Sequence, residues 1–234
     1  MKTLLLTSVM VMFVQTAWSQ ENNPGTISSG KITYEEKAIL DIKLEGDAAQ
    51  YAAMIPKERK SEKVLSFSNE ATLYEDSKAN AEEPPMEGGE GVMVRMVVSG
   101  DNRIYTDLKN NRIIEQRDFM NRIFIVERSF PDIKWKITGN QKTILGYPCM
   151  EAVSIDTAGV KTIAWFAPAI SIKGGPSLFS NLPGMVLEVN INDGAINYLA
   201  KSIEPVSQSE LKMEKPREGK TVTEIVDSIC RSPL

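Results

Sequence analysis

The chain has 234 residues, with 27 lysines and arginines against 31 aspartates and glutamates, and it contains no histidine. With 42% apolar and 25% charged residues, the composition is that of a globular protein rather than a disordered or membrane-spanning chain. The absence of histidine excludes a Ser-His-Asp or Cys-His nucleophile and a His-ligated metal. A formal net charge of -4 disfavours nucleic acid as a partner, because that partner requires a basic face.

Residues 1–19 have the features of a secretory signal peptide. Lys2 supplies a positive start, residues 4–14 are mostly apolar, and Ala17 and Ser19 are small residues placed as a signal-peptidase site requires. The apolar stretch is shorter than the roughly 20 residues that span a bilayer. We therefore expect export to the periplasm or cell envelope, cleavage near Ser19, and a mature chain without a transmembrane span.

Period-two alternation of apolar residues predicts strands along most of residues 20–234. The alternating segments are Ile32–Leu44, Ile133–Ile137 and Met185–Ile191. Other segments are rich in β-branched or aromatic residues and bounded by turn residues, namely Val92–Val98, Arg103–Leu108, Arg112–Phe119, Met150–Ile155 and Val160–Phe166.

Short turns separate these strands, and they determine how the strands pair. The turn signals include Asn110-Asn111, Gly139-Asn140 and Asp193-Gly194. Parallel neighbours would need crossovers of a dozen or more residues, so short turns predict an antiparallel sheet. We expect one mainly β domain of the α+β class over residues 20–234.

Residues 75–91 are an acidic, low-complexity stretch, with six carboxylates against Lys78, two prolines and a Gly-Gly pair. This composition cannot bury apolar surface, so it predicts a flexible, solvated loop. The acids lack the alternate spacing of a calcium-binding loop.

Two segments have helical rather than strand periodicity. In residues 47–58, Ala48, Tyr51, Ala52 and Ile55 form one apolar stripe, and residues 221–230 repeat this spacing after the capping box Thr221–Glu224. Both predicted helices are short, so we expect them to pack against the sheet.

The two cysteines, Cys149 and Cys230, allow two interpretations. In an oxidising compartment such a pair often forms a disulfide, which we predict here. Two buried, unpaired thiols are the alternative, since a free cysteine behaves as a small hydrophobic residue. A redox role lacks the C-x-x-C motif that it would need.

Residues 175–188, GPSLFSNLPGMVLE, together with the segments GKITY (30–34), WKIT (135–138), ILGYPC (144–149) and AWFAP (164–168), resemble the GLPGLI family of exported proteins. The sequence departs from the family string at Asn181, Met185 and Val186; asparagine, like glycine, tolerates a positive φ. The segment ILGYPC (144–149), followed by a Trp-bearing strand, also resembles the LolA-like lipoprotein carriers. That second resemblance implies a strongly curved, open half-barrel over helices.

The signature loop, residues 174–186, contains the candidate site residues. They are Pro176, Leu178, Phe179, Leu182, Pro183 and Gly184. Its apolar side chains either form a lip at a ligand cavity or plug the end of the sheet, and the plug is favoured. Glu188 is the only nearby acid, and we expect it to be solvated. Trp135 and Trp165 are expected in the core, with an aromatic wall for a lipid as the alternative.

These features predict an exported, non-catalytic envelope protein that binds an apolar ligand or lipid on the concave face of a curved sheet. The alternative is an accessory protein that binds a partner in an envelope complex. An enzyme ranks last, because no close pair of carboxylates stands out in an apolar setting. We expect no catalytic residue, cofactor or metal.

Overall fold

The structure, a computed structural model, describes residues 27–40, 56–78, 102–119 and 122–222. These residues form twelve strands and one short 3-10 turn, η3 (Asn192–Gly194). The strands are β1 (Gly30–Ile39), β2 (Glu58–Phe67), β3 (Ala71–Asp76), β4 (Arg103–Asp107), β5 (Arg112–Phe119), β6 (Arg122–Ser129), β7 (Lys136–Ile144), β8 (Tyr147–Ile155), β9 (Lys161–Ala167), β10 (Met185–Ile191), β11 (Ile196–Pro205) and β12 (Lys220–Val222).

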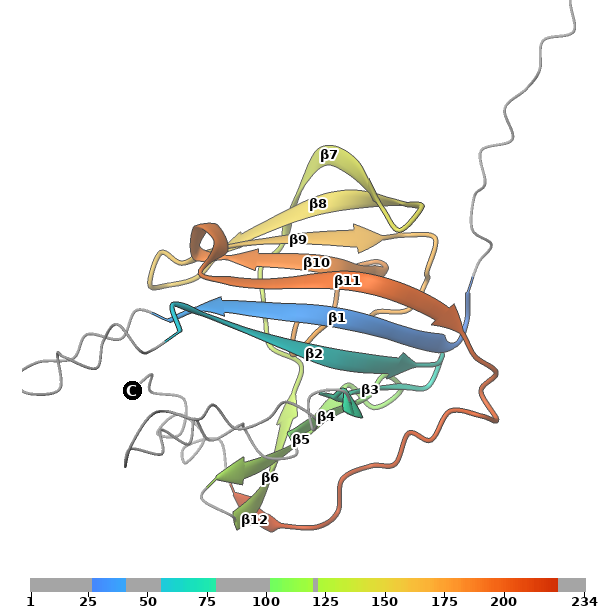
Figure 1. Cartoon of the computed structure of the whole chain (residues 1–234). Coiled ribbons are helices and arrows are strands. Elements are labelled where there is room, and N and C mark those ends of the chain that lie inside the picture. The colour runs from blue at the N-terminus through green and yellow to red at the C-terminus, as the bar shows by residue number, and fades with distance from the viewer. Residues whose placement is uncertain (1–26, 41–55, 79–101, 120–121, 223–234) are drawn as a thin grey trace, which may run out of the picture.

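All twelve strands belong to one open sheet in the order β12-β6-β5-β4-β3-β2-β1-β11-β10-β9-β8-β7. Neighbouring strands are antiparallel except β12, which pairs in parallel with β6. The two end strands, β7 and β12, lie at opposite ends of the molecule, so the sheet does not close (Figure 1). The prediction of a mainly β, antiparallel domain is confirmed.

Strand β1 occupies the middle of the sheet, where it joins the two ends of the chain. It pairs on one side with β2, its neighbour in sequence, and on the other side with β11. A meander of four further strands extends from β2, while β11 continues into the hairpins of β10 back to β7. The part of the sheet formed by β3, β2, β1 and β11 therefore contains residues from both halves of the chain.

The sheet twists and bends along its length. Figure 1 shows the strand direction rotating between β8–β11 and the end formed by β5, β6 and β12. Register shifts interrupt three strand pairs, between Thr33 and Tyr34, Val186 and Glu188, and Ile137 and Gln141. Such irregularities bend a strand and increase its local twist. The turn predicted at Gly139-Asn140 is in fact the last of these irregularities, inside β7.

Buried residues form two neighbouring clusters. The larger one joins β1, β2 and β3 with β7–β11 and contains Ile32, Leu65, Phe67, Met185 and Leu187. The smaller one lies over β8–β11 and contains Ala164, Phe166, Val186, Val189 and Tyr198. The segment between β9 and β10 contributes Ile170 and Ile172 to the larger cluster and Leu182 to the smaller one, so it connects the two.

The acidic loop begins later than the composition indicates. Glu75 and Asp76 are the last residues of β3, where Glu75 pairs with Arg103 at 2.9 Å and Asp76 pairs with Lys63 at 2.6 Å. Cross-strand ion pairs of this kind let acidic residues end a strand, which composition alone does not reveal. Residues 79–91 lie outside the described part of the chain.

The two predicted helices fall mostly outside the described residues. Of the segment 47–58, the structure describes only 56–58, and Glu58 already begins β2. Of the segment 221–230, it describes Thr221 and Val222, which belong to β12 rather than to a capped helix, because their backbone pairs with β6. The strand predicted over Val92–Val98 and the signal peptide over 1–19 also lie outside the described residues.

Candidate functional site

The signature loop leaves β9 and returns into β10 along a path held by backbone hydrogen bonds. The amide of Met185 donates to the carbonyl of Ile170 at 3.0 Å, and the amide of Val186 donates to the carbonyl of Gly174 at 2.8 Å. Within the loop tip, the amide of Phe179 donates to Pro176 and the amide of Ser180 donates to Leu178. The ends of the loop are thus anchored to the sheet, whereas its tip, residues 177–181, is held by these local turns.

Glycine is required at two positions of this loop. A Cβ atom at Gly175 would collide with the carbonyl oxygen of Phe179 and the side chain of Val186. At Gly184, φ is 154° and a Cβ atom would collide with the backbone of Ala167. Asn181 has φ 72° and is exposed, so the asparagine occupies the left-handed conformation that the sequence motif indicates.

The six candidate residues of the loop differ in burial. Pro176, Leu182 and Gly184 are buried, Leu178 and Phe179 are half-buried, and Pro183 is exposed. Leu182 packs in the smaller core cluster, and the ring of Phe179 lies 5.9 Å from that of Tyr198 on β11. The loop therefore packs onto the sheet through Leu182 and leaves Phe179 at the edge of the contact.

Beside Tyr198 lies a set of polar residues that we call the tyrosine cluster. Its members come from β1, β2, β3 and β11 and share one face of the sheet: Tyr34, Glu36, Lys63, Tyr74, Asp76 and Tyr198. Across the strand pairs, Glu36 faces Tyr198, Tyr34 faces Lys63, and Lys63 faces Asp76. Directly opposed side chains in a sheet are close enough to contact one another.

Two members of the tyrosine cluster have hydrogen-bond partners that fix them. The hydroxyl of Tyr34 donates to the carbonyl of Val186 at 2.6 Å, which ties β1 to the first residues after the signature loop. Lys63, which is only 9% exposed, donates from Nζ to Asp76 Oδ1 at 2.6 Å. The rings of Tyr34 and Tyr74 meet edge to face with their centres 6.2 Å apart.

Burial dominates the proton affinities in this cluster. It raises the pKa of Tyr34, Tyr74 and Tyr198 above the ordinary tyrosine value, so all three are neutral at physiological pH. Burial also raises the pKa of Glu36, although Lys63 and Arg59 act in the opposite direction. The cluster thus offers phenol hydroxyls and a carboxyl group, and its buried lysine is already paired.

Cys149 and Glu188 are not members of the tyrosine cluster, although Cys149 packs in the same core cluster as Tyr34 and Tyr74. Cys149 is buried, and burial raises the pKa of its thiol to about 11. The sequence predicts a solvated Glu188, but in the structure its carboxylate pairs with the Lys142 ammonium group at 2.7 Å. The same ammonium group lies 4.3 Å from the centre of the Trp165 ring. Trp165 and Trp135 are both half-buried against the core clusters. Cys230 lies outside the described residues, so the disulfide stays a prediction.

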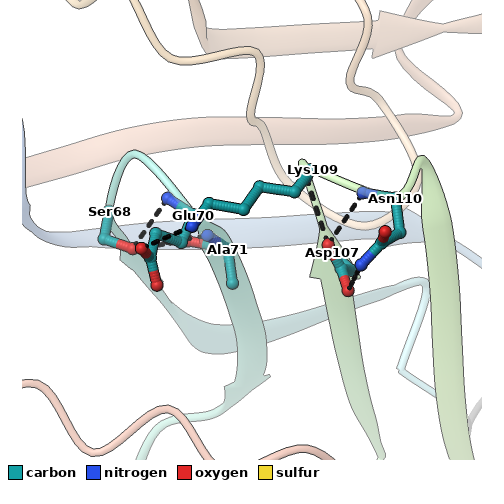
Figure 2. Close-up of polar contacts among 6 residues, drawn as sticks. All are labelled: Ser68, Glu70, Ala71, Asp107, Lys109 and Asn110. Atoms are coloured by element: carbon teal, nitrogen blue, oxygen red, sulfur yellow. Dashed lines mark hydrogen bonds and ion pairs between the residues drawn. The ribbon is translucent and has the colours of Figure 1, made fainter.

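A separate polar group joins the β2–β3 and β4–β5 turns (Figure 2). Asp107 accepts hydrogen bonds from the amides of Lys109 and Asn110 and from the Asn110 side chain, and Lys109 pairs with Glu70 at 2.6 Å. Ser68 Oγ accepts from the amides of Glu70 and Ala71. Ser68 is buried, while Glu70, Lys109 and Asn110 are exposed. These polar groups satisfy one another, so this group stabilises the turns and is not a candidate site.

The described residues contain no group of three or more cysteine, aspartate or glutamate side chains that could hold a metal ion. Nor does the described part of the chain contain a helix that is long and apolar enough to cross a membrane.

The fold defines the class of the protein as an open, mainly antiparallel β-sheet domain. Residues 96–229 match the family described as N-glycanase peptide, N-terminal domain, and the chain belongs to this family. No curated protein matches the chain. The resemblances to the GLPGLI and LolA-like families rest on the sequence motifs given above.

Solved structures with a similar fold include PNGF-II in two crystal forms. The C2 form has a TM-score of 0.56 at 18% identity, and the match covers 87% of this chain and 33% of that chain. The P21 form has a TM-score of 0.56 at 17% identity and covers 88% of this chain and 34% of that chain. The chain therefore spans about a third of the length of PNGF-II, and at this identity the likeness concerns the fold.

The sequence motifs identify the signature loop but not the tyrosine cluster next to it. One feature of the sequence points to the tyrosine cluster: Glu36 follows Ile32 and Tyr34 at every second position, so its side chain lies on the same, apolar face of the first strand. A carboxylate on the apolar phase of a strand requires a reason, because burying a charge is costly. The partners on β2, β3 and β11 could not be found this way, since they come from distant parts of the sequence.

Proposed function

We propose that this chain is an exported, non-catalytic binding module that recognises a hydroxyl-rich ligand of the glycan type on the face of the tyrosine cluster. The observation that supports it most is the gathering of three buried tyrosines around Glu36 on one face. Aromatic rings and hydroxyl or carboxyl groups in one place suit a sugar, which has both apolar faces and hydroxyls. The family name, which refers to an N-glycanase, supports the same ligand class.

Two features support a binding role over catalysis. The tyrosines have raised pKa values, so they are neutral at physiological pH and are poor bases. The thiol of Cys149, with its pKa raised to about 11 by burial, is a poor nucleophile.

A second candidate function is the carriage of an apolar ligand or lipid under the signature loop. It is favoured by Leu178 and Phe179, two large apolar side chains that the loop leaves half-buried. In this proposal two short helices, in the parts of the segments 47–58 and 221–230 that lie outside β2 and β12, complete a LolA-like half-barrel around the ligand. An envelope protein partner is the third alternative.

One experiment separates these candidates. The full chain, purified from the periplasm or medium without denaturation, is analysed by native mass spectrometry and then titrated with a neutral N-linked oligosaccharide and, separately, with a fatty acid. We expect the measured mass to be that of a chain starting at Gln20, without a retained lipid. We also expect the oligosaccharide to bind. A retained lipid or fatty-acid binding without sugar binding would favour the carrier, and a co-purified protein would favour the accessory role.

A further inference from the structure

The hydroxyl group of Tyr74 is the least expected feature of the tyrosine cluster. Tyr74 is 5% exposed, and in the described part of the chain no hydrogen bond reaches its hydroxyl. Buried polar atoms almost always have a partner, because leaving one unpaired in the interior destabilises the fold. A phenylalanine at this position would fill the same space without that cost, so the hydroxyl calls for a partner that arrives from outside.

Glu36 is the matching half of this arrangement. It is half-buried, and among the described residues no hydrogen bond or ion pair is made by its carboxyl group. Glu36 lies on the same face of the sheet as Tyr74 and follows two residues after Tyr34, whose ring contacts the Tyr74 ring. Its charge adds to the effect of burial in raising the pKa of Tyr74. Tyr74 can donate a hydrogen bond, and an ionised Glu36 can only accept one.

The surrounding charges select a neutral ligand. The positive charges of Lys63 and Arg59 lie close enough to influence Glu36, and they repel a cationic ligand at this place. The negative charges of Glu36 and Asp76 repel an anionic ligand. Lys63 is engaged by Asp76 at 2.6 Å and does not extend toward a ligand as a free ammonium group. A neutral group that both donates and accepts hydrogen bonds fits this field, and an alcohol is the simplest such group.

Aromatic rings adjoin the same place. The Tyr34 and Tyr74 rings pack edge to face, and the Phe179 ring of the signature loop packs against Tyr198, the residue opposite Glu36. Such rings supply apolar contact for the C–H face of a sugar ring. Glu36 is the more exposed of these two residues, whereas the Tyr74 hydroxyl is buried, so we expect a ligand to approach from the side of Glu36.

We propose that Tyr74 and Glu36 together bind a hydroxyl group of a neutral carbohydrate. The Tyr74 hydroxyl donates a hydrogen bond to the sugar oxygen, and the Glu36 carboxylate accepts a hydrogen bond from the sugar O–H. The inference rests on the proposed function and gives it a site. It places the binding residues on β1 and β3 rather than on the signature loop, which contributes only the Phe179 ring at the edge.

The test compares two variants with two matched controls in calorimetric titrations of the full chain with a neutral N-linked oligosaccharide. The test variants are Tyr74→Phe, which removes one hydroxyl, and Glu36→Ala. The controls are Tyr105→Phe and Glu35→Ala, because strand alternation places both residues on the opposite face of the sheet. We expect Tyr74→Phe to weaken binding by roughly five- to tenfold, as the loss of one hydrogen bond does, and Glu36→Ala by more, with both controls unchanged.

A thermal melt without ligand supplies the second measurement. Because the Tyr74 hydroxyl is unpaired, Tyr74→Phe should melt at the same temperature as the unchanged chain or higher, so weaker binding cannot be attributed to unfolding. Equal binding by all four variants would overturn this site and leave the proposed function standing. If the unchanged chain does not bind the oligosaccharide, the proposed function fails, and this site fails with it. A lower melting temperature for Tyr74→Phe would show that the hydroxyl has a structural partner and would also overturn the inference.

Discussion

A half-buried carboxyl group without a bonding partner destabilises a fold at neutral pH, and Glu36 is such a group in the described residues. Burial raises the pKa of the Glu36 carboxyl group above its ordinary value. A raised folded-state pKa means that the neutral form fits the fold better than the ionised form. Its contribution to stability is present in full below the unfolded-state pKa and is lost as the pH rises through the folded-state pKa.

The variant Glu36→Gln should therefore be more stable than the unchanged chain at pH 7.5. The difference should shrink as the pH falls toward 4, where the carboxyl group becomes neutral in both states. Thermal melts of both proteins across this pH range measure it, and Glu35→Gln, on the other face of β1, is the control. A difference that stays constant with pH would show that Glu36 does not titrate differently in the folded chain.

At the scale of the element, the signature loop combines a buried anchor with an exposed rim. Leu182 is 2% exposed in the smaller core cluster, while Phe179 touches Tyr198 from a half-buried position and Pro183 is exposed. The energetic contributions of these side chains should follow their burial, because a truncated side chain loses both transfer free energy and packing contacts.

Truncation of the two apolar side chains should separate the anchor from the rim. We expect Leu182→Ala to cost about 2–5 kcal/mol of unfolding free energy and Phe179→Ala to cost less, about 1–2 kcal/mol. Urea unfolding of the two variants measures this, and Pro183→Ala serves as the control from the same loop. A loss for Phe179→Ala at least as large as for Leu182→Ala would make Phe179 the anchor and exclude it as a ligand lip.

Several predicted strands match the structure where the apolar pattern is local. The prediction over Ile133–Ile137 is wrong for its first three residues, because β7 begins only at Lys136. Strands β5 and β10 have the predicted bounds, and β4 differs by one residue at its end. Strand β2 was not predicted, because its first half, ERKSEK, is entirely polar and has no alternation to detect. Its backbone nevertheless pairs along the whole length of β1, and the cross-strand pair Lys37–Glu58 shows how polar residues can occupy such a strand.

At the scale of the whole molecule, the predicted disulfide would connect β8 to the end of the chain. Cys149 is buried, and Cys230 lies outside the described residues. Thiol titration of the denatured, unreduced exported protein should find no free thiol. Two free thiols would exclude the bond, and Cys149 would then be the unreactive buried thiol that its pKa of about 11 indicates.

Individual strands such as β5 and β10, the antiparallel pairing and the positions of the glycines in the signature loop follow from the sequence by itself. They follow because alternation and turn chemistry act over a few residues, which the sequence shows directly. The tertiary structure alone decided that β1 lies between β2 and β11, and hence that Glu36 faces Tyr198 across a strand pair. That pairing joins residues far apart in the chain, and it is selected by the burial of the whole sheet rather than by any local preference.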